Sequence, residues 1–294
     1  MNQKNSCFIC GRPLKLKHKS NFKAKNDAFA FASRKIPDYT HFDLYECSVC
    51  KVLIAQKIYE QADLDKQYKK ADFDSSFEAR FASKTYIKYL TKVLPAFVPQ
   101  RILDIGTGEG SFLLESLSKW KDALIIGVEP SDAPIKEADD VIRKNILNKP
   151  FDVKDFKKDE FDLVSCFQTI EHIPDSLKLL NDIKTILNPN GYAYFVCHNY
   201  CSFTNRLLGL KSPIYDIEHL QIYSKKSIKL LFEEAGFKNI KLFTIKNRYS
   251  LSYWFRLLPL PLKIKNFIEK MDFPKKITIG INVGNLGIIA QKQE

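Results

Sequence analysis

The segment Leu103–Gly110, which reads Leu-Asp-Ile-Gly-Thr-Gly-Glu-Gly, constrains the fold of this chain more than any other. An apolar run ends in Asp104, three glycines follow at alternate positions, and Ser111–Leu117 then carries apolar residues at helical spacing. This pattern predicts a buried strand, a tight glycine turn and the start of a helix. Such a turn lets the backbone approach a ligand closely, and the free N–H groups of the helix attract an anion.

The spacing of the glycines separates this turn from a dinucleotide-binding loop. That loop places its third glycine three residues after the second, where this chain has Ser111, and Gly110 comes one residue earlier. Glu129 ends a second apolar run, Leu124–Glu129, nineteen residues after Gly110. An acid at the tip of a second strand is placed to accept hydrogen bonds from two ribose hydroxyls.

Strand and helix signals alternate along the rest of the chain. This order predicts a doubly wound, mostly parallel sheet whose last two strands extend one edge. The expected strands are 102–105, 124–129, a weak one at 141–142, 161–167, 192–196, 238–245 and 286–290, and the expected helices are 111–119, 177–187 and 225–235.

The glycine pattern, together with its two acids, resembles the class I S-adenosylmethionine (SAM)-dependent methyltransferases. The resemblance implies a Rossmann-like α/β fold with a mostly parallel seven-stranded sheet and SAM as cofactor. It further implies that the turn cradles the amino-acid end of SAM, with Asp104 near its amine and Glu129 at its ribose. The alternative is an ordinary strand–turn–helix connection without a ligand. The implied cofactor residues here are Asp104, Gly106, Thr107, Gly108, Gly110 and Glu129.

The run Ile170-Glu-His-Ile-Pro174 resembles the segment that follows the fourth strand in these methyltransferases. The resemblance implies that Phe167 and Gln168 lie beside the cofactor. His172 is a candidate general base because imidazole titrates near neutral pH. Alternatively, Glu171 and His172 cap or orient the next helix. Some related enzymes bind a divalent ion through an acid at the position of Gln168, so the glutamine weakens that ligand set.

A second Glu-His pair, Glu218-His219, lies in the stretch 216–224 after the fifth expected strand. This stretch resembles sugar C-methyltransferases that carry an N-terminal four-cysteine zinc lobe. The resemblance implies that His219 removes a proton from the acceptor and that Glu218 orients it. Asp216 stands where those enzymes have a catalytic tyrosine. A structural link that holds the loop is the alternative, and His198, after the fifth strand, is a second candidate base.

Two Cys-x-x-Cys pairs near the N-terminus have the spacing of a zinc site. Each pair can place two thiolates on one metal ion, and two pairs complete a tetrahedral structural site with no open position. A redox pair or unligated packing cysteines are the alternatives, and two histidines nearby are substitute ligands. The expected zinc ligands are Cys7, Cys10, Cys47 and Cys50, and the substitutes are His18 and His41.

These signals divide the chain into a zinc-binding lobe at 1–58, a helical linker or cap at 59–98 and a methyltransferase domain at 99–294. An aromatic, basic insertion at 246–283 is expected to be a lid, an interface or, over 249–268, a peripheral membrane contact. Charge is uneven: the net charge is +7 over 1–70, −1 over 71–245 and +6 over 246–294. Basic flanks favour phosphate-bearing partners, although a solvated lysine-rich surface also explains them.

The sequence therefore predicts a SAM-dependent methyltransferase whose acceptor is a small molecule, with a sugar, a nucleotide-linked sugar or a surface-glycan precursor favoured. An RNA methyltransferase that grips phosphates with its basic lobe is the first alternative. A non-catalytic binding module of the same fold is the second. A polar start at 1–6, the lack of a long apolar run and seven cysteines without a disulfide framework lead us to expect a cytoplasmic protein.

Overall fold

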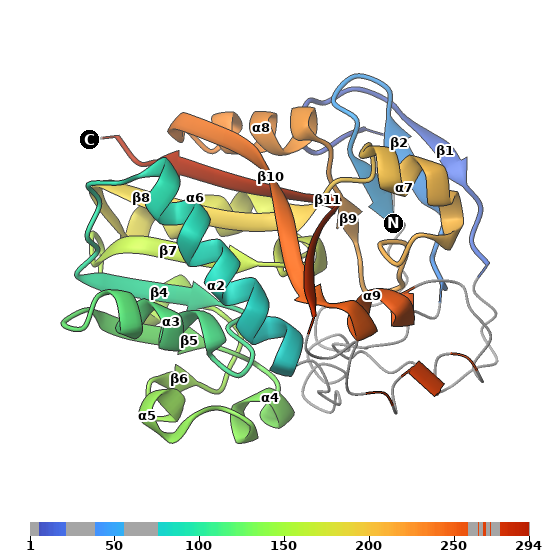
Figure 1. Cartoon of the computed structure of the whole chain (residues 1–294). Coiled ribbons are helices and arrows are strands. Elements are labelled where there is room, and N and C mark those ends of the chain that lie inside the picture. Colours follow the sequence, from blue (N-terminus) through green and yellow to red (C-terminus); the bar gives the residue numbers. More distant parts are fainter. Residues whose placement is uncertain are drawn as a thin grey trace.

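The computed structural model describes residues 6–21, 39–55, 76–257, 264, 267–268, 271 and 277–293. Two sheets organise this part of the chain (Figure 1). The larger has seven strands in the order β10-β11-β8-β7-β4-β5-β6, and the smaller has four in the order β1-β2-β3-β9. The smaller sheet joins the N-terminal lobe to the larger body, because β9 comes from the C-terminal half of the chain.

The bounds of the elements follow the alternation expected from the sequence. The strands of the large sheet are β4 (Arg101–Ile105), β5 (Leu124–Val128), β6 (Ile146–Leu147), β7 (Phe161–Phe167), β8 (Leu187–His198), β10 (Lys238–Ser250) and β11 (Thr278–Gln291). The α-helices are α2 (Ser76–Val93), α3 (Ser111–Lys119), α4 (Asp132–Lys136), α5 (Asp140–Arg143), α6 (Ser176–Ile186), α7 (Phe203–Leu208), α8 (Lys225–Glu234) and α9 (Leu251–Leu257). Three short 3₁₀ turns are η1 (Val153–Asp155), η2 (Ile170–His172) and η3 (Gly209–Lys211).

Five neighbouring strands of the large sheet, β8-β7-β4-β5-β6, are parallel, and β11 runs antiparallel to both β8 and β10. This arrangement confirms the predicted Rossmann-like α/β fold with a mostly parallel seven-stranded sheet. Parallel strands end at the same edge of a sheet, so the loops after β4, β5, β7 and β8 meet there. The glycine turn and both Glu-His runs come after these strands or close to their ends.

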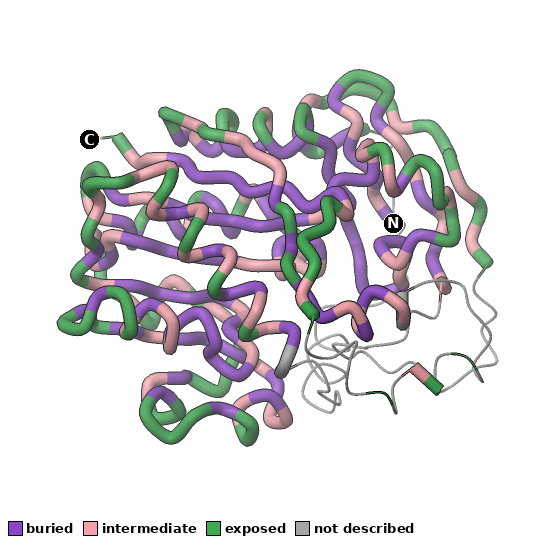
Figure 2. Tube along the Cα trace, in the orientation of Figure 1, coloured by how far each residue is buried: buried purple, intermediate pink, exposed green. Residues whose placement is uncertain are grey.

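Helices cover both faces of the large sheet, and β8 shows how the two faces form. Ala193 and Phe195 pack in one core cluster with residues of α6 and α8, whereas Tyr194 and Val196 pack in the other with residues of α2 and α3. Successive side chains of a strand point to opposite faces, so both sets become buried. Figure 2 shows the buried strands running through the body between more exposed helices.

One expected strand is wrong. Residues 141–142 lie in the short helix α5, and the third parallel strand, β6, begins at Ile146. The side chain of Asp139 accepts a hydrogen bond from the N–H of Val141, which caps a helical turn instead of extending the chain. Within the helical linker or cap expected over 59–98, the structure has α2 at Ser76–Val93, and residues 59–75 lie outside the described part of the chain.

The small sheet is built from β1 (Leu14–His18), β2 (Leu44–Cys47), β3 (Leu53–Ala55) and β9 (Gln221–Ile222). All three pairings between them are antiparallel. A shared core cluster joins the lobe to the loop before β9, because Phe42, Leu44 and Leu53 pack against residues of 214–222. The lobe is thus fixed to the loop that carries the second Glu-His pair.

Part of the insertion expected at 246–283 is instead a continuation of strands β10 and β11. Residues 246–250 continue β10, residues 278–283 continue β11, and α9 follows β10 directly. Tyr249 and Trp254 are buried, and the Trp254 indole N–H donates to the Ile279 carbonyl at 2.9 Å. These aromatic side chains therefore stabilise the body. Much of the rest of the segment expected to contact a membrane lies outside the described residues.

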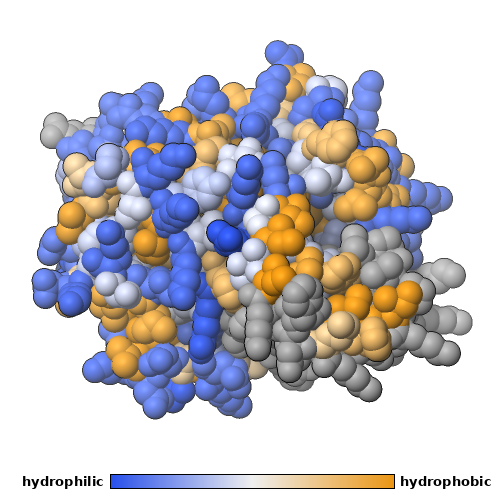
Figure 3. All heavy atoms as spheres, viewed as in Figure 1, coloured by the Kyte–Doolittle hydropathy of each residue, from blue (hydrophilic) through white to orange (hydrophobic). Residues whose placement is uncertain are grey.

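The surface contains exposed apolar side chains near the same region, including Ile279 and Ile281 on β11. Figure 3 shows hydrophobic patches on an otherwise mostly hydrophilic face. Among the residues that the structure describes, none of the helices combines the length and the hydropathy that crossing a bilayer requires.

Two glycines of β11 provide a matched test of packing in the sheet. A Cβ at Gly287 would lie 2.2 Å from the ring of Phe243, its cross-strand partner, whereas a Cβ at Gly280 meets nothing within 4 Å. We expect Gly287→Ala to lower the free energy of unfolding by about 1–3 kcal/mol, because the ring must move. Gly280→Ala is the control and should change it by less than about 0.5 kcal/mol. Equal effects in urea denaturation would contradict this packing.

Candidate functional site

The three glycines after β4 all adopt left-handed backbone conformations, with φ of 70°, 58° and 76° at Gly106, Gly108 and Gly110. A Cβ at Gly106 would lie 2.4 Å from the Thr169 hydroxyl oxygen, and one at Gly110 would lie 2.4 Å from Ile142. Around Gly108 nothing lies within 4 Å of that position. The outer glycines thus allow close packing, and Gly108 leaves open space in which a ligand can approach the backbone.

Asp104, at the end of β4, is buried and holds the glycine turn to β7. Its two carboxylate oxygens accept hydrogen bonds from the Thr107 and Ser165 hydroxyls, each at 2.7 Å. Burial raises the pKa of Asp104 to about 7, which the two hydroxyl bonds oppose and the charge of Glu129 reinforces. Sequence reasoning missed Ser165, whose role depends on the register between β4 and β7.

Glu129 follows β5 and lies beside the same turn. Its carboxylate accepts hydrogen bonds from the backbone N–H groups of Gly108 at 3.0 Å and Ser131 at 2.8 Å. Burial raises its pKa, and these two backbone bonds act against that rise. The acid expected at the ribose and the glycine with open space around it are therefore in direct contact.

Phe167 and Gln168, at the end of β7, occupy different environments. The Phe167 ring packs 4.5 Å from the Tyr86 ring and 4.7 Å from the Phe112 ring, measured between centroids, so it belongs largely to the core. Gln168 has a left-handed backbone with φ of 51° and donates its N–H to the Val196 carbonyl at 2.8 Å. Strained backbone of this kind clusters at functional sites. Tyr86 lies on α2, and no sequence signal linked it to this site.

Three of the five histidines in the chain meet at the same edge of the sheet. The ring centroid of His219 lies 4.9 Å from that of His172 and 5.1 Å from that of His198. Glu218 approaches the same group, with 3.8 Å between its carboxylate and Nδ1 of His172. The structure therefore brings together all the candidate bases, which lie on three separate segments of the chain.

The rings of this cluster are held neutral. Burial lowers the pKa of His172, His198 and His219, and the pKa of His198 falls to about 3. Nδ1 of His219 lies 2.8 Å from the carbonyl oxygen of Ile214. A carbonyl only accepts, so Nδ1 carries the proton and Nε2 keeps its lone pair. A neutral imidazole with a fixed tautomer is the form that a general base requires.

Glu171 forms hydrogen bonds with two of the segments that carry the cluster. One carboxylate oxygen accepts the backbone N–H of His198 at 2.6 Å, while the carbonyl of Glu171 accepts the N–H of Leu220 at 2.9 Å. The other carboxylate oxygen finds no hydrogen-bond partner in the described chain, and burial raises the pKa of this carboxyl to about 7. The alternative in which Glu171 caps the next helix is wrong, because Asp175 caps α6.

The N-terminal lobe holds the loop that carries Glu218 and His219. The Ala55 N–H donates to the Leu220 carbonyl at 2.9 Å, and β3 pairs with β9 immediately after that residue. The Ser224 hydroxyl donates to the carbonyl of Cys50 at 3.1 Å. These bonds agree with the alternative in which the segment around Glu218 and His219 is a structural link. The side chains of the pair nevertheless lie at the histidine cluster.

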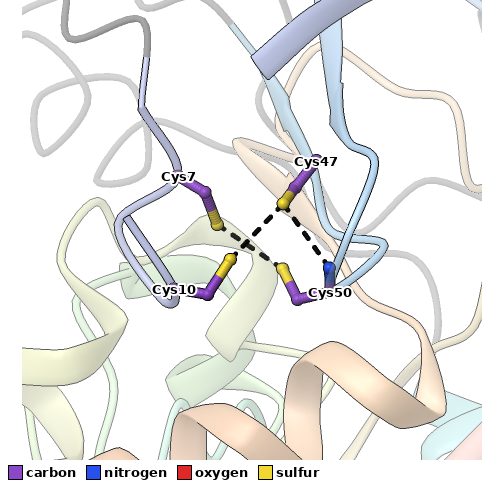
Figure 4. Close-up of side chains that lie close together, drawn as sticks. All are labelled: Cys7, Cys10, Cys47 and Cys50. Atoms are coloured by element: carbon purple, nitrogen blue, oxygen red, sulfur yellow. Dashed lines mark hydrogen bonds between the residues drawn. The ribbon is translucent and has the colours of Figure 1, made fainter. Parts of the chain in front are cut away.

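The four cysteines of the lobe form a compact cluster (Figure 4). Their sulfur atoms all lie within 4.8 Å of one another, and Cys7–Cys50 and Cys10–Cys47 are each separated by 3.5 Å. Four thiolates bound about 2.3 Å from one zinc ion lie about 3.8 Å apart, so the cluster fits a tetrahedral site. His41 bonds to the Phe42 carbonyl instead, and the cluster contains no histidine.

Comparisons with known proteins agree with this geometry. A family model described as a methyltransferase domain matches residues 76–242, more than half of the chain. The solved structure of Haemonchus contortus phosphoethanolamine N-methyltransferase 2 in complex with S-adenosyl-L-methionine has a TM-score of 0.51 at 16% identity, covering 82% of this chain and 62% of that one. This likeness shows the fold alone.

Curated relatives are similar over a shorter stretch. A ubiquinone biosynthesis O-methyltransferase of Histophilus somni is 26% identical over 121 residues, covering 38% of this chain and 50% of the relative. One from Actinobacillus pleuropneumoniae serotype 5b is 25% identical over 151 residues, covering 46% and 64%. The chain thus spans between half and just under two thirds of the length of these relatives.

The cysteine cluster leads to a test by metal analysis. We expect about one zinc ion per purified chain, and the variant Cys47→Ser with Cys50→Ser should lose it, because half of the ligand set is gone. Cys201→Ser is the control, since this cysteine lies outside the cluster. Elemental analysis that finds no metal in the wild-type protein, or full retention in the double variant, would rule out the site.

The neutral histidines should make stability depend on pH. Near pH 6.5 and below, the histidines of the unfolded chain bind protons that the folded rings do not, so their contribution to the free energy of unfolding falls as pH drops from 7 to 5. The buried carboxyls of Asp104 and Glu171, whose pKa is raised to about 7, contribute in the opposite direction, so the test compares a histidine variant with the wild type. His198→Gln should reduce this loss by on the order of 1 kcal/mol. Urea denaturation of both proteins at the two pH values measures the difference. A variant that loses as much free energy as the wild type would contradict the assignment.

Proposed function

This chain belongs to the methyltransferase-domain family, and on that premise we propose that it transfers a methyl group from SAM to a hydroxyl group of a small-molecule acceptor. One observation carries the proposal. The glycine turn and Glu129 end at the same sheet edge as a cluster of neutral histidines. A methyl-donor site and a proton acceptor are the two elements that this reaction needs.

The residues of the glycine turn fit SAM. Gly108 leaves room for its amino-acid end, and the N-terminus of α3 offers backbone N–H groups to its carboxylate. Glu129 would accept hydrogen bonds from the ribose hydroxyls, and Asp104 keeps the turn in position through Thr107 and Ser165. When bound, SAM supplies an electrophilic methyl group on a sulfonium centre.

His219 is the base we propose. Its Nδ1–H is tied to Ile214, so Nε2 is free to take the acceptor's proton while the hydroxyl oxygen attacks. Glu218 lies beside His172, where it can orient the acceptor. His172 and His198 pack around the base and, being neutral, do not oppose its protonation as cations would.

The names of the relatives favour a hydroxyl acceptor, because both reported above are O-methyltransferases of ubiquinone biosynthesis. They lend no support to the sugar or glycan precursor expected from the sequence. We therefore leave the carbon skeleton open in the proposal and include RNA as a comparison in the test. The zinc lobe, in this proposal, buttresses the acceptor loop through β3 and β9.

Calorimetric titration with SAM tests the cofactor site. Glu129→Gln should weaken binding about tenfold or more, because the amide cannot accept hydrogen bonds from both ribose hydroxyls through two oxygens. Glu115→Gln, on the side of α3 that faces Lys84 of α2, is the control and should bind like the wild type. Equal affinity of Glu129→Gln and wild type would refute the assignment.

A screen with labelled SAM against hydroxylated aromatic compounds, nucleotide sugars, lipid-linked glycans and total RNA identifies the acceptor class. With the best acceptor, His219→Gln should lower kcat by about 10²-fold or more and leave the SAM Kd unchanged. His18→Gln, a lobe histidine outside the cluster, should retain activity. A His219→Gln enzyme with wild-type kcat would rule out His219 as the base.

A further inference from the structure

A cavity of about 460 Å³ lies between the N-terminal lobe, the start of α8 and the middle of β11, at 282–286. Three lysines, Lys51, Lys225 and Lys226, line it, and no acid is among its described lining residues. Its size falls within the range of small-molecule sites, about 300–1,000 Å³. A concave site with only cationic charge attracts an anion.

The backbone of Lys51 is in a conformation that favours glycine. Its φ is 60°, and it follows Cys50 in the second cysteine turn as Gly11, with φ of 67°, follows Cys10 in the first. A non-glycine residue in the left-handed region loses roughly 1–2 kcal/mol. Lysine therefore occupies a position where glycine would cost less. Among the described residues Lys51 pairs with Glu46, at 3.5 Å, and this partly exposed pair contributes little.

Lys225 and Lys226 are also placed where the local backbone disfavours them. They occupy the first turn of α8, whose N-terminus carries the positive end of the helix dipole, and this turn contains no acid. Neither lysine forms an ion pair with any residue that the structure describes. A bound anion would relieve this unfavourable interaction with the helix dipole.

Three asparagines add neutral donors to the lining. The side-chain oxygen of Asn199 accepts the Cys201 N–H at 3.0 Å, and that of Asn282 accepts the Gly284 N–H at 3.0 Å. The oxygen of Asn285 lies 3.0 Å from Nδ1 of His198. Each oxygen is thus engaged within the chain, so these amides offer a ligand their NH₂ groups, which are donors only.

Asn285 also connects the cavity to the site of methyl transfer. It lines the cavity and contacts His198, whose ring lies 5.1 Å from that of His219. Through these two contacts the cavity lies beside the histidine cluster, which contains the base that we propose.

We infer that this cavity binds a phosphate or diphosphate group of the acceptor, and this inference rests on the proposed function. Lysine ammonium groups and amide donors are common phosphate ligands, and the phosphate would anchor the acceptor while its hydroxyl faces His219. A cavity favours a compact phosphorylated molecule over the extended backbone of RNA, which binds along open grooves.

Inorganic pyrophosphate is the probe, measured by calorimetry and thermal shift at matched ionic strength. Wild-type protein should bind it, and Lys225→Glu with Lys226→Glu should weaken binding about tenfold or more. Because acids favour the first turn of a helix, the melting temperature of this variant without ligand should equal or exceed that of the wild type. Lys121→Glu with Lys238→Glu changes the net charge equally at exposed positions outside the cavity and should bind normally.

Lys51→Gly gives a second, independent measurement. Glycine suits a φ of 60°, so this variant should fold with unchanged or higher melting temperature and bind pyrophosphate several-fold more weakly. No binding to the wild type, or equal binding by all variants, would overturn the inference. If an RNA oligonucleotide displaces pyrophosphate at a concentration below that of the pyrophosphate, the assignment to a small-molecule ligand would be overturned.

The SAM titration separates this inference from the proposed function. The lysine variants should bind SAM like the wild type, since none of these lysines lies in the glycine turn. Pyrophosphate binding without SAM binding would refute the methyltransferase proposal and retain the anion site. SAM binding without pyrophosphate binding would refute the anion site and retain the methyltransferase proposal.

Discussion

The shared direction of β4, β5, β7 and β8 is the constraint on which the rest of the structure depends. Their backbone hydrogen bonds are satisfied only within the sheet, in a parallel register that aligns Ile105, Val128 and Phe167 at one edge. The glycine turn, Glu129 and Gln168 follow these ends directly, and His198 is the last residue of β8. The sheet therefore brings together groups that are far apart in the sequence, and no direct contact between them is needed.

Burial at this edge determines the charge state of the site. Asp104 and Glu171 lose hydration, and both have a pKa raised to about 7, while the three histidines have lowered values. The acids are thus less charged and the bases neutral, so little net charge is buried in the folded protein. Hydroxyl and backbone donors, rather than salt bridges, hold these groups in place.

The cysteine lobe complements this edge from outside the large sheet. Its strand β3 extends through β9 into the chain that carries Glu218 and His219, and Ser224 reaches back to Cys50. The lobe also supplies Lys51 to the cavity beside α8. The lobe that carries the four cysteines thus contacts both the loop of the second Glu-His pair and the cavity.

The sequence by itself determined the parts of this protein that depend on local periodicity and backbone conformation. The glycine turn, most of the individual strands and helices of the large sheet, and the paired cysteine spacing are properties of short segments. The strand expected at 141–142 failed because Asp139 caps a helical turn, a local bond that apolar periodicity does not reveal.

Only the tertiary structure decided which segments share a site. The meeting of His172, His198 and His219, the bond from Ser165 to Asp104 and the link from Asn285 to His198 depend on strand order and register. The number of residues between two segments does not tell how close they lie in space, because strand order and register decide which strand ends are neighbours. The three lysines of the cavity became meaningful for the same reason, once the lobe and α8 were placed against each other.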